Sequence, residues 1–105
     1  MIGKIVKIDT SPSTGGCDIW TAQPVRDKIG LIIQRSTGPH LGCYDVFVPG
    51  HYYNNASNGL WPVKPICVRE ILPKGKVQRK LKRLWKEYKE IRMLRSAMEG
   101  TANGL

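Results

Sequence analysis

The apolar residues of the C-terminal third recur at the spacing of a helix. From Val77 onward they fall in steps of four, three, four and three, so that they share one face. Good helix formers, chiefly Lys, Arg, Glu, Leu and Met, fill most positions of this stretch. Gly75 precedes it and Gly100 follows it, as expected at helix ends. The sequence therefore predicts one amphipathic helix over about residues 76–98. Its apolar face consists of Val77, Leu81, Leu84, Trp85, Tyr88, Ile91, Leu94 and Met98.

This helix is longer than the remainder of so small a protein is wide. At about 1.5 Å per residue it spans roughly 35 Å, whereas residues 1–73 can form only a small body. The first turns of the helix are expected to pack on that body. The distal half, from Tyr88 to Met98, is expected to contact a protein partner or a second copy of the chain. The predicted partner-contact residues of the helix are Trp85, Tyr88, Ile91, Leu94 and Met98.

The positive charge is concentrated in the same segment. The chain of 105 residues has a formal net charge of +9, and residues 74–95 hold ten of its seventeen Lys and Arg residues. Residues 74–86 contain no acidic residue. Such asymmetry predicts a nucleic-acid or acidic protein-surface partner. The predicted nucleic-acid-binding residues are Lys74, Lys76, Arg79, Lys80, Lys82, Arg83 and Lys86.

A second interpretation of these charges remains open. Glu87 and Glu90 lie four residues after Arg83 and Lys86, and such pairs are common on an ordinary solvated helix face. The basic face would then serve solubility and protein contacts alone. A membrane-surface or calmodulin-binding helix is disfavoured, because Glu87, Tyr88 and Glu90 dilute that pattern.

Residues 1–73 have the pattern of short β-strands separated by turns. The expected strands are residues 2–8, 29–33, 43–50 and 63–72, with a further short one at 18–23, ending before Pro24. Gly30, inside the strongest apolar run, suggests a bulge or a close backbone approach. Four or five short strands followed by one helix predict a mainly β fold with one α-helix, a small β-barrel carrying a long basic amphipathic C-terminal helix.

Three segments of the β region carry a resemblance to a known fold. These are DKIGLII at 27–33, YDVFV at 44–48 and ICVREI at 66–71. Together they resemble the small SH3-like β-barrel proteins of tailed bacteriophages, and more distantly the KOW-type modules of ribosomal and transcription proteins. The resemblance covers about residues 25–72 and implies an SH3-like barrel, which we expect over residues 1–73. The helix is expected at 74–99, with a flexible tail at 100–105. It also implies a phage-encoded protein.

The loop before the last predicted strand is rich in aromatic residues. Tyr52, Tyr53 and Trp61 are predicted partner-contact residues, because exposed rings stack on bases or anchor a protein partner. In the alternative arrangement, Trp61 caps the barrel and only one tyrosine is exposed.

The cysteines and histidines offer a zinc site that we disfavour. His40 and Cys43 have the gap at which one turn presents two ligands, and Cys17 and Cys67 would complete a set of four. Structural zinc sites usually use two such pairs, and only one occurs here. An odd number of widely spaced cysteines favours free thiols in a reducing compartment. We expect no metal and no cofactor, while the convergence of these four residues stays open.

No constellation of catalytic residues emerges from the sequence. His40 and His51 lie in different predicted loops, a Cys43–His51 dyad has no supporting pattern, and no phosphate-binding glycine loop is present. We therefore expect a non-catalytic binding module for nucleic acid or another polyanion, or for an acidic surface. The alternative is a virion or assembly subunit whose helix and long loop contact its neighbours, and a protein that binds and inhibits a host factor is a third.

The sequence also bounds where such a protein acts. No apolar run reaches the about 18 residues of a membrane span, and the N-terminus has no export signal. We expect no membrane partner, and we expect the protein in the host-cell cytoplasm or in the virion.

Overall fold

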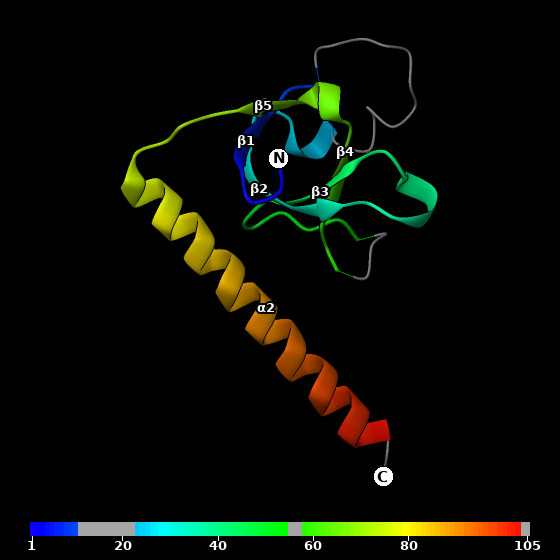
Figure 1. Ribbon diagram of the computed structural model, residues 1–105. Helices are drawn as coiled ribbons and strands as arrows, with labels where there is room; N and C mark the ends of the chain where they lie inside the picture. Colours follow the sequence, from blue (N-terminus) through cyan, green and yellow to red (C-terminus); the bar gives the residue numbers. More distant parts are fainter. Residues whose placement is uncertain (11–22, 55–57, 104–105) are drawn as a thin grey trace.

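The chain folds into a five-stranded antiparallel sheet and one long helix (Figure 1). The computed structural model describes residues 1–10, 23–54 and 58–103, with the backbone alone from residue 94 onward. The strands are β1 (Ile5–Ile8), β2 (Ile29–Arg35), β3 (Tyr44–Phe47), β4 (Trp61–Val63) and β5 (Val68–Glu70). Short 3₁₀ helices are η1 (Gln23–Val25), η2 (Gly38–His40) and η3 (Pro65–Cys67), and the long helix is α2 (Gly75–Asn103). The prediction of a mainly β fold with one helix is confirmed.

The strands are arranged in the order β4-β3-β2-β1-β5, so that the last strand pairs with the first. Ile5 of β1 lies opposite Leu31 of β2, which in turn lies opposite Phe47 of β3. The next positions along these strands pair Ile32 with Val46. Because side chains alternate between the two faces of a sheet, these two rows point to opposite sides.

Each face of the sheet is covered by its own apolar cluster. The inner cluster is built on the row of Ile32 and Val46 and also contains Trp61 and Cys67. The outer cluster consists of Ile5, Leu31, Phe47 and Leu60 together with Leu81 of α2. Strands buried on both faces need apolar residues at successive positions, which explains the run Ile-Gly-Leu-Ile-Ile in β2.

The helix packs across the outer face through residues 81–88. Leu81 is 6% exposed, and Leu84, Trp85 and Tyr88 pack against the outer cluster while partly exposed. The Phe47 ring lies 5.1 Å from the ring of Trp85 and 5.2 Å from that of Tyr88. Beyond this contact the C-terminal part of α2 runs away from the sheet (Figure 1). Packing on the protein's own body was expected for the first turns, and it is observed from Leu81 to Tyr88, whereas Val77 in the first turn is 42% exposed.

Gly30 is required by close packing between neighbouring strands. A Cβ atom at this position would lie 2.5 Å from Val46 Cγ1 and 3.0 Å from the carbonyl oxygen of Phe47. Of the two alternatives predicted for Gly30, the close approach is confirmed. The irregularity in the β2–β3 pairing lies elsewhere, between Ile32 and Gln34.

The predicted strands at 18–23 and 63–72 need correction. Residues 18–22 lie outside the described residues, and residues 23–25 form η1 instead of a strand. The predicted strand at 63–72 is divided, because Pro65 starts the 3₁₀ helix η3 and pairing resumes only at β5. Its first residue belongs to β4, in which Pro62 is tolerated because β4 is an edge strand. The helix also continues to Asn103, so that residues 100–103 extend it where a tail was expected.

The loop between β3 and β4 is attached to α2 through Tyr88. The Tyr88 hydroxyl donates a hydrogen bond to the carbonyl oxygen of Asn58 at 2.7 Å. Gly59 has a φ of +69° and lies so close that a Cβ atom on it would overlap this hydroxyl. Both the backbone conformation and the space therefore require glycine at this position.

The substitution Gly59→Ala should separate these two requirements. A left-handed φ costs an alanine about 1–2 kcal/mol of stability, and overlap with Tyr88 adds to that cost. Gly38→Ala is the matched control, since Gly38 has a φ of +68° and a Cβ atom added to it would meet no heavy atom within 4 Å. We expect Gly59→Ala to lower the free energy of unfolding, measured by urea denaturation, by more than Gly38→Ala does.

The additional cost of Gly59→Ala over Gly38→Ala should disappear in a variant that lacks the Tyr88 hydroxyl. In Tyr88→Phe, we expect Gly59→Ala to cost no more than Gly38→Ala costs in the same background. An equal cost for the two glycine substitutions in the original chain would contradict the described contact between loop and helix.

Candidate nucleic-acid interface

Four basic residues of α2 form a row on the side facing away from the sheet. Lys76, Arg79, Arg83 and Lys86 follow one another at spacings of three, four and three, which places them on one helix face. All four are exposed. This face lies opposite the docked residues, which are Leu81, Leu84, Trp85 and Tyr88. The packing of those residues on the sheet therefore leaves it exposed to solvent. The row covers about 15 Å along the helix axis.

The other three predicted cations lie outside this row. Lys74 precedes α2, and its carbonyl oxygen accepts hydrogen bonds from the backbone N–H groups of Val77 and Gln78 at 2.9 and 3.2 Å. Lys80 and Lys82 are exposed on the two flanks of the helix. Lys82 lines a small cleft of about 180 Å³ together with Lys4 and Glu70, where β1, β5 and α2 meet. The seven predicted cations thus fall into two groups, with four in the exposed row and three outside it.

The acidic residues of the helix do little to neutralise the row. Within the described part of the chain, Arg83 is the one member with an ion pair, 3.9 Å from Glu87. Both side chains are more than half exposed, at 66% and 56%. Exposed pairs of this kind are worth a few tenths of a kcal/mol, so that Arg83 can exchange Glu87 for another anion at little cost.

Two of the three predicted aromatic contacts in the loop before β4 are corrected by the structure. Trp61 is 7% exposed, lies in the inner cluster, and donates a hydrogen bond from Nε1 to the carbonyl oxygen of His51 at 3.0 Å. Tyr53 is half-buried against it, with ring centres 5.2 Å apart. Tyr52 is 47% exposed. As in the alternative arrangement, Trp61 is covered and only one of the two tyrosines is exposed, with Trp61 buried in the inner cluster.

The predicted partner-contact residues of the helix include some that dock on the sheet and some that are exposed. Trp85 and Tyr88 contact the protein's own sheet, so that much of their surface is already covered. Ile91 is 60% exposed and Met93 73% exposed. The side chains of Leu94 and Met98 lie outside the described residues. Met93 was missed because it falls off the apolar face that the helical spacing defines.

Two further cations lie against the aromatic rings of the helix. Lys89 Nζ is 5.4 Å from the centre of the Trp85 ring, and Arg92 Cζ is 5.7 Å from the centre of the Tyr88 ring. Sequence reasoning did not assign a binding role to either residue. The sequence contained a signal for both contacts, because each cation follows its aromatic partner by four residues, the spacing that brings side chains together on a helix.

The residues considered for zinc are not grouped. Among the described residues no three His, Cys, Asp or Glu side chains are placed to share a metal ion. Cys17 lies outside the described residues, while Cys43 and Cys67 are buried. Burial, reinforced by the negative charge of Asp9, raises the pKa of Cys67. Its thiol therefore stays protonated near neutral pH, and the thiolate is the form that binds metals and attacks electrophiles.

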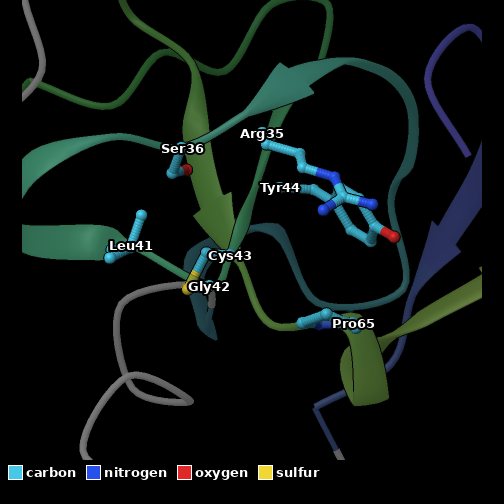
Figure 2. Close-up of a pocket in the computed structure, with 7 residues that line it drawn as sticks. All are labelled: Arg35, Ser36, Leu41, Gly42, Cys43, Tyr44 and Pro65. Atoms are coloured by element: carbon cyan, nitrogen blue, oxygen red, sulfur yellow. The ribbon is translucent and has the colours of Figure 1, made fainter.

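A separate surface pocket lies at the end of β2. Figure 2 shows its lining, which comes from the end of β2, the loop before β3, Tyr44 and the start of η3. Its volume is about 410 Å³. The lining contains the cation Arg35 and none of the cations predicted to bind nucleic acid. It consists of Arg35, Ser36, Leu41, Gly42, Cys43, Tyr44 and Pro65.

Comparisons with known proteins leave the site to be interpreted from its own chemistry. No family model matches the chain, and neither the curated proteins nor the solved structures provide a match. Over the described residues, none of the helices is both long enough and apolar enough to cross a membrane.

Proposed function

We propose that this protein is a non-catalytic, phage-encoded module that binds nucleic acid through the outward face of its C-terminal helix. The observation that carries the proposal is the exposed row of Lys76, Arg79, Arg83 and Lys86 on the helix face opposite the docked one. A rigid row of cations attracts the phosphate backbone and releases its counterions. The segment that contains the row, residues 74–86, has no acidic residue to oppose this attraction.

The docking of α2 supports this proposal over a merely solvated face. A free helix would lose conformational entropy on binding, whereas this one is already held by Phe47, Trp85 and Tyr88. Its cations are therefore presented at a fixed spacing, and binding that needs less ordering is tighter. We propose that the underlying sheet is an SH3-like barrel, supported by the pairing of β5 with β1 and by the Val-Arg-Glu sequence of β5.

Neutralising two cations of the row tests the proposal. In Arg79→Gln/Lys86→Gln, we expect weaker binding to a fluorescent DNA or RNA oligomer in an anisotropy titration. The slope of log K against log of the salt concentration should become shallower by about 1.5, since each lost phosphate contact removes about 0.7–0.9 counterions. Glutamine keeps a good helix former at both positions.

The matched control neutralises two exposed lysines on the sheet side. Lys7→Gln/Lys28→Gln lowers the net charge by the same amount, and both residues are exposed. We expect the salt slope of this variant to remain that of the original protein. Equal effects of the two pairs would mean that only net charge matters, and unchanged binding in both would remove the row from any interface.

A second candidate function is that of a virion or assembly subunit. The observation that favours it is the exposure of Ile91 and Met93 beyond the docked part of α2. Exposed apolar side chains on a projecting helix suit a contact with another subunit or with a second copy of the chain.

This candidate predicts self-association that depends on these side chains. Light scattering after size exclusion should give a mass above that of one chain, 11.8 kDa, and Ile91→Lys/Met93→Lys should return the protein to a monomer. A chain that is monomeric at every concentration and absent from assembled particles would contradict the assembly role and leave the nucleic-acid proposal standing.

A further inference from the structure

We infer that the nucleic acid is single-stranded, with one base stacked on the exposed face of Tyr52. This inference rests on the proposed function and specifies the class of nucleic acid. It depends on a different set of residues from the cationic row, namely an aromatic pair at the point where α2 leaves the sheet. A single strand and a duplex both present phosphates to the cations, whereas only a single strand has bases free to stack on the protein.

Tyr52 and Tyr88 form an ordered stacking platform. Their rings are 5.1 Å apart and nearly parallel, at an interplanar angle of 5°. Tyr88 is itself stacked on Phe47 and bonded to Asn58, which holds the platform in place. Tyr52 is 47% exposed although one of its faces lies on Tyr88, so about half of the residue remains accessible to solvent. A planar base that stacks there would continue a column of rings that already exists.

Cations connect this platform with the outward row. Five cations form a band and follow one another at spacings of three, four, three and three residues. They are Arg79, Lys82, Lys86, Lys89 and Arg92. A step of three residues turns back around the helix by about 60° and a step of four turns forward by about 40°. The band therefore curves from the outward face toward the docked side, where Arg92 lies at the Tyr88 ring. Its rise is about 20 Å, the length of a few nucleotides of strand.

The last two cations of the band are held in position by the rings beneath them. Lys89 lies over Trp85 and Arg92 over Tyr88, and a cation held in this way loses less side-chain freedom when a phosphate arrives. A strand whose phosphates follow the band would bring a base beside Tyr52. Base stacking on aromatic residues contributes about 1–3 kcal/mol per base and tolerates any sequence.

A duplex cannot use the platform without a cost. Its bases are stacked on one another, and extruding one costs a few kcal/mol. The duplex would then gain from the cations alone, whereas a single strand gains from the cations and from Tyr52. The expected preference for a single strand is at least about tenfold in affinity, which corresponds to one stacked base.

The test compares polyanions that differ in whether bases are free to stack. Anisotropy titrations at one salt concentration would use an oligothymidylate and an oligouridylate of about twelve nucleotides, a mixed-sequence duplex of the same length, and inorganic polyphosphate as competitor. We expect either oligomer to bind at least tenfold more tightly than the duplex. The ratio between thymidylate and uridylate reports the combined effect of the sugar and of the thymine methyl group.

Substitutions at Tyr52 test whether this residue causes the preference for a single strand over a duplex. Tyr52→Leu keeps an apolar contact for Tyr88 but removes the ring, and should reduce the single-strand affinity about tenfold without changing the salt slope or the displacement by polyphosphate. Tyr52→Phe keeps the ring and should restore the preference. Circular dichroism and thermal unfolding verify that each variant is folded.

The outcomes separate this inference from the proposed function. Equal affinity for single strand and duplex, or a preference that survives Tyr52→Leu, would overturn the stacking inference while the cationic row still explains binding. Failure to bind any of the polyanions would overturn the inference and the proposed function together. A duplex preference would show that the band contacts both strands and would also overturn it.

Discussion

The packing of α2 on Phe47 is the contact on which the rest of the structure depends. The central strands are apolar on both faces, and the inner cluster covers only one of them. Without Leu81, Trp85 and Tyr88, the row of Ile5, Leu31 and Phe47 would face water. Burying one such side chain contributes about 1.5–3 kcal/mol, a large share of the stability of so small a domain. The helix is therefore an integral layer of the fold, packed on the outer face of the sheet.

The same contact determines which side chains of α2 are available for function. Docking through one face leaves the opposite face, with Lys76, Arg79, Arg83 and Lys86, exposed to solvent. It also brings Tyr88 to the loop before β4, where it orders Tyr52 and requires glycine at position 59. A cationic row and an aromatic platform thus follow from one packing contact. The proposed binding of single strands uses both.

The sequence predicted local elements better than it predicted which ones meet. Helical spacing placed α2, and apolar runs located β1, β2 and β3, because these patterns are local. It missed β4, since Pro62 and the loop before it disguise a three-residue edge strand. It assigned Trp61, Trp85 and Tyr88 to a partner because exposure of an aromatic side chain depends on tertiary packing. The stacking of Tyr52 on Tyr88 became visible only once the loop and the helix were placed together.

The central claim, that α2 is a docked layer of the fold, is tested most directly by native-state hydrogen exchange. We predict that the amides of residues 81–88 and those of β2 exchange with similar free energies of opening, because the helix and the sheet share one cluster. An undocked helix would be only marginally stable in water. Rapid exchange throughout α2 while the β2 amides remain protected would contradict this claim.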